Sequence, residues 1–315
     1  MLVIDSGGSL FWVKNALFTA AAEGDIPVLA VRDGENGIQT LAEDLGPGVI
    51  GIDKNWPSHF LLELMAACPR TYVEGSGPVD RARAVKDAEE IRLMRESSAV
   101  NDRCMARLAA WLRAGVTERE AAEYLRTLYK EEGCEDVSFP PIIAFGFHGA
   151  DPHHTVSDAA LAPGASVLID IGGRKNRYCS DMTRTYFFGD VPEEIRRVHA
   201  VVCKACETAE ALVRPGVPLA DLDRAARSVI EEAGYGGQFT HRLGHFIGQS
   251  DHEAGEVSSA SPLAAEPGMI FSIEPGIYLP GKFGVRIEDL VLVTETGADI
   301  LNRLPHSPFI EEARL

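Results

Sequence analysis

One segment of this chain places two carboxylates on either side of a polar turn, and this arrangement constrains the fold strongly. The segment is "VLIDIGGRKNRYCSDMTRTYFF", residues 167–188, with Asp170 before the turn and Asp181 after it. Their midpoint falls between Lys175 and Asn176. Residues equidistant from a hairpin turn lie opposite each other, with Cβ atoms about 5 Å apart. The spacing therefore predicts an antiparallel hairpin with two facing aspartates.

A second segment, "SIEPGIYLPGKFGVRIEDL", follows the same pattern. Glu274 and Glu288 are equidistant from Gly281, which lies in the expected turn. Facing carboxylates beside apolar strand residues repel each other, so such a pair must share a proton or bind a cation. One pair near a turn is more often solvated, but two pairs favour metal. Four carboxylates exceed the usual need of one divalent ion, and this predicts a two-metal site.

The order of expected elements indicates a small α/β domain over residues 1–79. Its expected strands are "IPVLAV", "VIGID" and "TYVEG", and its expected helices are "IQTLAEDLG" and "SHFLLELMAAC". Turn residues in "GSGPV", residues 75–79, mark the end of this domain.

The pattern of helical and β-type segments over residues 80–315 predicts a larger α+β domain. Its four expected helices run from about Asp87 to Gly115, from Thr117 to Gly133, from Pro192 towards Gly216 and from Pro218 to Gly234. Capping residues or prolines begin them and glycines end them. β-type segments follow each pair of helices, so the two halves of the domain are expected to repeat one plan.

Charge and hydropathy exclude several classes of partner. The 315 residues carry 30 basic and 47 acidic side chains, a net charge of −17, without a basic run. Nucleic acid and anionic membranes are therefore not expected partners. The apolar runs are far shorter than the ~20 residues of a membrane helix, and no basic segment precedes an apolar one at the N-terminus. A cytoplasmic protein is expected.

Six scattered cysteines do not resemble a secreted disulfide framework. Cys203 and Cys206 form a CxxC inside an expected helix, but no second pair accompanies it. We interpret both as packing residues rather than as zinc or redox residues.

Histidines cluster in two places near the carboxylate segments. "THRLGHFIGQSDHE" contains His241, His245 and His252, and "GADPHHTVSD" contains His153 and His154. For His241, His245 and His252, exposed loop histidines are an equally good interpretation from the sequence alone. The other four have no such context and are interpreted as structural: His59, His148, His199 and His306.

These motifs together resemble the methionine aminopeptidase, prolidase and creatinase superfamily of metallopeptidases, which has the pita-bread fold. "IDIGGRKNRYCSDMTRTY" is similar to the aspartate hairpin of the family, and "HRLGHFIG" to its metal-histidine motif. "SIEPGIY" and "VRIEDLVLV" resemble its two glutamate strands, and "RAVKDAEEIRLMRES" resembles the helix that opens its catalytic domain. The resemblance extends from about Arg83 to near the C-terminus.

The resemblance implies a ligand set for two divalent ions. Asp170 would hold one ion, Asp181 and Glu288 would bridge both, and His245 and Glu274 would hold the second. Oxygen-rich sets with one imidazole suit Mn²⁺, with Co²⁺ or Zn²⁺ as other candidates.

The resemblance also implies a mechanism, in which a water bridging the two ions acts as hydroxide. Glu274 would accept and deliver the proton. His153 and His252 would line the site as catalytic residues, one ordering the substrate amide and the other donating to the oxyanion, with His154 as the alternative to His153. His241 and Arg286 would lie near the substrate, where Arg286 could anchor a carboxylate or a ligand.

The combination of "EPGIY" with "VRIED" favours the Xaa-Pro aminopeptidase and prolidase branch. The implied activity is hydrolysis of the bond between an N-terminal residue and proline. Creatinase-like C–N hydrolysis and methionine aminopeptidase activity are alternatives, and a non-catalytic peptide-binding module is a remote one. Residues 1–79 resemble only the later part of the family's N-terminal domain, so a shortened domain is expected. A homodimer is also expected from the resemblance.

Overall fold

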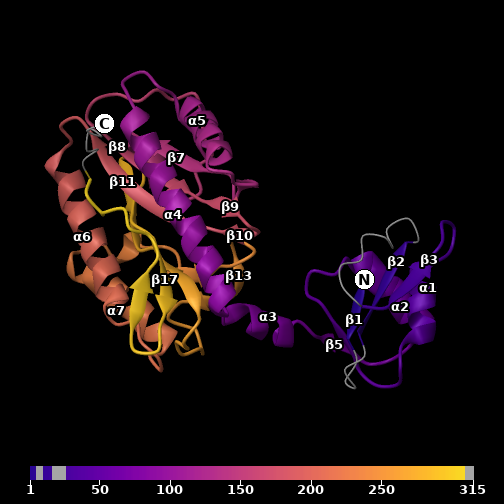
Figure 1. Cartoon of the computed structure of the whole chain (residues 1–315). Helices are drawn as coiled ribbons and strands as arrows, with labels where there is room; N and C mark the ends of the chain where they lie inside the picture. Colours follow the sequence, from indigo (N-terminus) through magenta and orange to yellow (C-terminus); the bar gives the residue numbers. More distant parts are fainter. Residues whose placement is uncertain (5–9, 16–25, 309–315) are drawn as a thin grey trace. The chain divides into compact units, whose positions relative to one another are not determined.

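The computed structural model of the chain describes residues 1–4, 10–15 and 26–308. The chain forms two compact units, Met1–Val79 and Asp80–Leu315, and each is considered by itself (Figure 1). None of the helices in the described ranges is long and apolar enough to cross a membrane.

The first unit is a small α/β arrangement. Strands β1 (Leu2–Ile4), β2 (Leu10–Asn15) and β3 (Val28–Val31) form one sheet, and β4 (Ile50–Ile52) pairs in parallel with β5 (Tyr72–Glu74). Helices α1 (Gly37–Asp44) and α2 (Ser58–Ala67) supply Leu41 and Leu64 to its core. The five elements expected here are confirmed, whereas β1 and β2 were not predicted.

The segment expected to be a turn at residues 75–79 is partly helical. Helix α3 (Gly77–Ala84) begins within it, so its turn residues lead directly into a helix. Pro78 is the second residue of α3, where its fixed φ is compatible with the helix and its missing N–H costs no hydrogen bond.

The second unit contains the four expected helices: α4 (Ala88–Trp111), α5 (Glu118–Glu131), α6 (Glu193–Glu210) and α7 (Leu219–Glu232). Thr117 and Glu120 form a capping box at the start of α5. Asp87 and Glu90 form another at the start of α4. These boxes satisfy backbone N–H groups that have no partner within the helix.

Each helix pair packs on its own strands. The α4 and α5 side chains share a core with β7 (Ile142–Phe145), β8 (Ala165–Ile171) and β11 (Met182–Phe188), which form a sheet in the order β11-β8-β7. The α6 and α7 side chains share a core with β12 (Gly244–Phe246), β13 (Glu253–Val257), β14 (Ile270–Ile273) and β17 (Asp289–Val293). In Figure 1 the two helix pairs lie on opposite sides of the strands. The predicted α+β domain with two halves of one plan is confirmed.

Shorter strands complete both halves. They are β6 (Asp136–Val137), β9 (Gly173–Lys175), β10 (Tyr178–Cys179), β15 (Gly276–Leu279), β16 (Phe283–Arg286) and β18 (Ala298–Ile300). The second large sheet has the order β13-β12-β14-β17-β18, while β15 pairs with β16. Two 3₁₀ helices, at Gly146–Ala150 and Gly236–Gln238, lie in the connections.

The predicted register of the aspartate hairpin was wrong by two residues. Asp170 pairs with Thr183 instead of Asp181, because the turn centre lies between Asn176 and Arg177. Both turn residues have positive φ, as a tight two-residue hairpin turn requires. An even shift keeps every side chain on the same face of the ladder, so both aspartates still share one face.

The register of the glutamate hairpin is as predicted. The pairs Gly276 with Arg286 and Ile273 with Asp289 place Glu274 opposite Glu288 in the same register. Both glutamates lie in short breaks between assigned strands, where β14 gives way to β15 and β16 to β17.

A close backbone approach at Gly244 yields a stability prediction. A Cβ at Gly244 would overlap the carbonyl oxygen of Ser272 on the neighbouring strand β14. Because backbone cannot move aside as a side chain can, we expect Gly244→Ala to lower the free energy of unfolding by on the order of 3 kcal/mol. Gly237→Ala is the control, since nothing lies within 4 Å of its Cβ position. Urea unfolding of both variants measures the difference, and equal stability would contradict the close approach.

Candidate metal centre and active site

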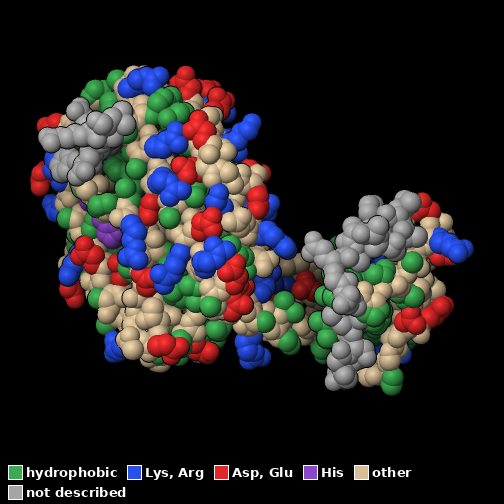
Figure 2. Space-filling view, viewed as in Figure 1, with side chains coloured by type: hydrophobic (Ala, Val, Ile, Leu, Met, Phe, Trp, Pro, Cys, Tyr) green, Lys and Arg blue, Asp and Glu red, His purple; other side chains and the backbone are tan. Residues whose placement is uncertain are grey.

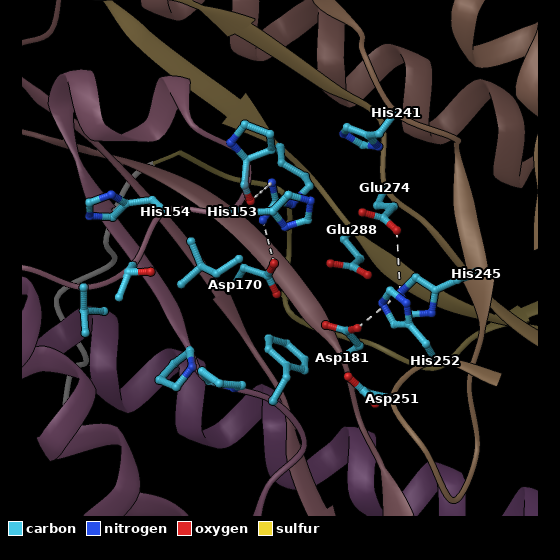
Figure 3. Close-up of a pocket in the computed structure, with 18 of the residues that line it drawn as sticks. His153, His154, Asp170, Asp181, His241, His245, Asp251, His252, Glu274 and Glu288 are labelled. Atoms are coloured by element: carbon cyan, nitrogen blue, oxygen red, sulfur yellow. Dashed lines mark hydrogen bonds and ion pairs between the residues drawn. The ribbon is translucent and has the colours of Figure 1, made fainter. Parts of the chain in front are cut away.

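A cavity of about 690 Å³ opens in the second unit, within the size range of small-molecule sites. It is lined by all the residues predicted from the sequence to form the site: His153, His154, Asp170, Asp181, His241, His245, His252, Glu274, Arg286 and Glu288. Asp251, Arg242 and an apolar group from Phe139 to Ile142 complete much of the wall. Figure 3 shows the labelled carboxylates grouped with His153, His241, His245 and His252, whereas His154 lies to one side.

Four of the five predicted ligands come from the ends and breaks of strands, and His245 lies within a strand. Asp170 lies near the end of β8, and Asp181 directly precedes β11. His245 is in the middle of β12, and its Nε2 lies 3.5 Å from Asp181 Oδ2 and 3.6 Å from Glu274 Oε1. Potential ligand atoms of Asp181, His245 and Glu288 all lie within 4.8 Å of one another.

Burial makes this carboxylate group electrostatically unfavourable when no cation is bound. Loss of hydration raises the pKa of Asp170. The pKa of Asp181 is raised well above its usual range by loss of hydration and, after it, by the negative charges of Asp170 and Glu274. Burial, followed by the charges of Asp181 and Glu274, likewise raises the pKa of Glu288. The protein must therefore compensate these groups with protons or with cations.

The donor atoms fit a divalent cation. Asp170 Oδ1 and Asp181 Oδ1 are buried and have no hydrogen-bond partner among the described residues. His245 Nδ1 lies 3.2 Å from the carbonyl oxygen of Phe246, which can only accept, so Nδ1 carries the proton and Nε2 keeps its lone pair. A metal-ligating histidine typically has this arrangement. Unpartnered carboxylate oxygens and a free imidazole lone pair are the donors that such an ion needs.

Arg286 holds the edge of the carboxylate group in place. Its guanidinium donates to Asp170 Oδ2 at 2.5 Å, to Tyr278 Oη at 2.8 Å and to Thr183 Oγ1 at 3.1 Å. Thr183 in turn donates to Glu288 Oε2 at 2.7 Å. Arg286 is thus engaged with a predicted ligand, one of the two contacts expected for it.

Sequence reasoning missed Thr183 and Tyr278. The correct hairpin register would have indicated Thr183, because it lies directly opposite Asp170. Tyr278 could have been found from strand alternation, since it lies four positions after Glu274 and so faces the same side.

His241 is half-buried and His252 is exposed in the wall of the cavity, and partial loss of hydration lowers the pKa of each. His241 Nδ1 donates to the Arg242 carbonyl oxygen at 2.7 Å, which leaves Nε2 to accept from Tyr278 Oη at 2.9 Å. The His252 ring stacks on His245, with centroids 3.9 Å apart. Arg242 can only donate, so His252 Nδ1 accepts from it at 3.3 Å and Nε2 carries the proton.

The two adjacent histidines of the "PHHT" motif face different surroundings. His154 Nε2 bonds to Glu118 Oε2 at 2.8 Å, and its ring stacks on His148. Its ring points away from the carboxylates in Figure 3. The His153 ring makes no hydrogen bond to Glu118. It lies close enough to His241 for its charge to lower the pKa of His241. This geometry favours His153 over His154 as the residue facing the reacting groups.

The raised carboxylate pKa values predict how stability depends on pH in metal-free protein. A carboxyl group whose pKa is raised by folding stabilises the fold fully below its unfolded value of about 4, and this contribution is lost as pH rises towards the folded value. The melting temperature of the chelator-treated wild-type protein should therefore fall as pH rises from 4 to 7. The fall should be larger than that of a chelator-treated double variant, Asp181→Asn with Glu288→Gln. Mn²⁺ should remove this difference at pH 7. If the melting temperatures of the two proteins changed with pH in parallel, the inferred repulsion among the buried carboxylates would be contradicted.

Comparison with known proteins gives consistent results. The model of metallopeptidase family M24 matches residues 92–295. An uncharacterized peptidase of Staphylococcus haemolyticus is 42% identical over 233 residues, which are 73% of this chain and 66%, just under two thirds, of the relative.

Two solved structures are similar along nearly the whole chain. A prolidase from Pyrococcus furiosus has 31% identity and a TM-score of 0.89, and the match covers 96% of this chain and 89% of that one. An X-Pro aminopeptidase from Thermotoga maritima has 34% identity and a TM-score of 0.84, with 95% and 87% covered. With the family match and these likenesses, the chain belongs to metallopeptidase family M24 and has the pita-bread fold of its Xaa-Pro peptidase branch.

Proposed function

We propose that this protein uses two divalent metal ions to hydrolyse the peptide bond between an N-terminal residue and proline. The observation that carries this proposal is the convergence of five metal-type ligands in one cavity, with buried carboxylate oxygens for which the described part of the chain offers no hydrogen-bond partner. The similar solved structures, a prolidase and an X-Pro aminopeptidase, support proline as the second residue of the substrate.

The ligands would divide between two ions. Asp181 and Glu288 are the most deeply buried of the carboxylates and are our proposed bridging ligands. Asp170 would hold one ion, and His245 with Glu274 the other. The oxygen-rich set favours Mn²⁺. When bound, the ions supply an acidified water and polarise the scissile carbonyl.

Glu274 is the proposed proton carrier. Its side chain is 16% exposed, against 6% for Asp181, so it can meet both a water and a leaving nitrogen. Ser272 Oγ donates to Glu274 Oε1 at 3.2 Å and thereby fixes its orientation. A carboxylate placed beside the attacking water can accept its proton and pass it to the amine that leaves.

His252 and His153 are the proposed contacts to the reacting amide. The His252 Nε2–H faces away from Arg242 and is available to donate to the oxygen that becomes negative during attack. A neutral imidazole is a suitable donor because it brings no competing charge to the cation site. His241 is engaged at both ring nitrogens, so we propose that it shapes the wall beside the substrate.

The apolar part of the wall can receive the proline ring. Phe139, Pro141, Ile142 and Val156 line this side of the cavity. An amide nitrogen that belongs to proline has no N–H, so the site needs no acceptor for one. Burial of the ring against apolar side chains would then favour proline at this position.

Substrate screening with Mn²⁺-loaded enzyme tests this function. We expect release of proline from Xaa-Pro dipeptides, or of the first residue from longer Xaa-Pro peptides, and at least 100-fold lower kcat/KM for matched Xaa-Ala substrates. Comparison of dipeptides with tripeptides separates dipeptidase from aminopeptidase activity. Cleavage of Met-Ala peptides or creatine alone would instead indicate the methionine aminopeptidase-like or creatinase-like alternative. No turnover and no bound metal would indicate a peptide-binding module.

Replacement of a bridging ligand tests the metal assignment. Asp181→Asn should lower kcat by more than the roughly 10- to 100-fold that loss of an outer partner causes, since it removes a ligand of both ions. The fold should persist, because the change also removes a buried charge. Asp158→Asn, at an exposed surface pair with Arg119, is the control. Activity assays with circular dichroism measure both effects, and full activity of Asp181→Asn would refute the assignment. A cytoplasmic homodimer remains our prediction for the assembled protein.

A further inference from the structure

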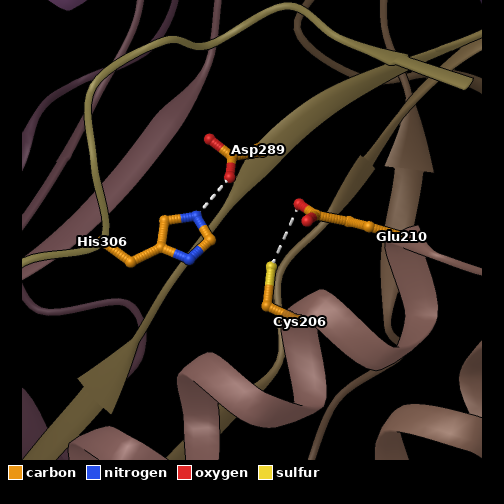
Figure 4. Close-up of side chains that lie close together, drawn as sticks. All are labelled: Cys206, Glu210, Asp289 and His306. Atoms are coloured by element: carbon orange, nitrogen blue, oxygen red, sulfur yellow. Dashed lines mark hydrogen bonds and ion pairs between the residues drawn. The ribbon is translucent and has the colours of Figure 1, made fainter.

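A second group of metal-type ligands lies outside the catalytic cavity. Cys206 and Glu210 are one turn apart on α6, Asp289 begins β17, and His306 lies on the segment that follows β18. One potential ligand atom from each lies within 4.8 Å of the other three. Figure 4 shows the four side chains directed towards one another from these three parts of the chain. None of the four lines the cavity described above.

This group is buried but reachable from solvent. Cys206 is fully buried and Asp289 is 2% exposed, whereas the His306 side chain is 19% exposed. Cys206 Sγ lies 3.4 Å from Glu210 Oε1, and His306 Nε2 lies 2.5 Å from Asp289 Oδ2. The two more exposed members, Glu210 and His306, offer a path by which an ion could enter.

We propose that Cys206, Glu210, Asp289 and His306 form a binding site for one Zn²⁺ ion. Thiolate, imidazole and carboxylate are the three ligand types of protein zinc, and four ligands complete a tetrahedral site. Cys206 and Glu210 lie on successive turns of α6, Asp289 lies on β17, and His306 lies on the C-terminal segment. Zinc would therefore crosslink α6 to the second sheet.

The charge balance supports a divalent ion. Arg184, which is fully buried, donates to Asp289 Oδ1 at 2.6 Å and leaves Oδ2 for another partner. With Cys206, Glu210 and Asp289 ionised, the group carries three negative charges against the one positive charge of Arg184. One Zn²⁺ makes the total zero. Without the ion, protons on Cys206 and Glu210 must supply the same two charges, so binding exchanges two protons for one zinc ion.

Two distances between ligand atoms can be compared with those of a zinc site. Zn–N and Zn–O bonds of ~2.0–2.1 Å and Zn–S bonds of ~2.3 Å place tetrahedral ligand atoms about 3.3–3.6 Å apart. The 3.4 Å separation of Cys206 Sγ and Glu210 Oε1 already has this value. His306 Nε2 must move by less than about 1 Å from Asp289, and His306 lies outside any helix or strand.

The thiolate distinguishes this site from the catalytic one. The catalytic ligands are four carboxylates and one imidazole, a set that suits Mn²⁺, whereas a thiolate selects zinc over manganese. The proposal does not depend on the reaction catalysed in the cavity. It also gives Cys206 a ligand role beyond packing, with partners other than Cys203.

Cobalt substitution tests the site by a signal that the catalytic ligands cannot give. Metal-stripped full-length protein, kept anaerobic, is titrated with Co²⁺ and followed by near-ultraviolet absorption. We expect a thiolate-to-cobalt charge-transfer band that Cys206→Ser abolishes and Cys203→Ser, the matched control three residues away on α6, leaves unchanged. After dialysis against Zn²⁺, metal analysis should find one ion per chain fewer in Cys206→Ser than in Cys203→Ser.

Two further variants keep the test valid if Cys206→Ser fails to fold. Glu210→Gln and His306→Ala alter the two more exposed ligands, and each should weaken Co²⁺ binding at the thiolate site at least tenfold while the Asp181→Asn variant retains the band. Absence of the band in the wild-type protein would overturn the proposal. Its persistence in Cys206→Ser, or equal zinc content in the two serine variants, would overturn it as well.

Discussion

Mutual repulsion among buried carboxylates is the constraint on which the rest of the site depends. Asp181 and Glu288 are removed from water and lie near other acids, which raises the pKa of both. Arg286 neutralises Asp170, and Thr183 donates to Glu288, so both contacts lessen the repulsion. Much of the polar network around the cavity therefore holds the carboxylates in positions that cations would stabilise further.

The sequence predicted the members of the site better than their pairing. All five proposed ligands reach one cavity, and the glutamate register is as predicted because Gly281, at its centre, has a positive φ that suits a turn. The aspartate register was wrong because the actual turn residues, Asn176 and Arg177, do not stand out in a long polar run. An arginine at positive φ follows from the twist that the hairpin needs, and local preference alone does not indicate it.

Other features required tertiary contacts that no local pattern encodes. The strands β1 and β2 were missed because short strands without clear alternation give little periodic signal. The choice between His153 and His154 was open in the sequence, and it is the contact of His154 with Glu118, distant in sequence, that separates them. The group around Cys206 was invisible for the same reason, since Asp289 and His306 come from distant segments.

Glu288 and Asp289 are neighbours in sequence but serve different surroundings, and this fixes the alignment of β17. Glu288 accepts from Thr183 in the catalytic cavity, whereas Asp289 pairs with Arg184 and His306. Every residue of β17 is buried, so apolar alternation does not define which way its side chains should face. A slip by one residue that moved Asp289 into the place of Glu288 would move Leu290 into the place of Asp289, so the buried Arg184 would face an apolar side chain. Charge, rather than hydrophobicity, thus sets the register of β17.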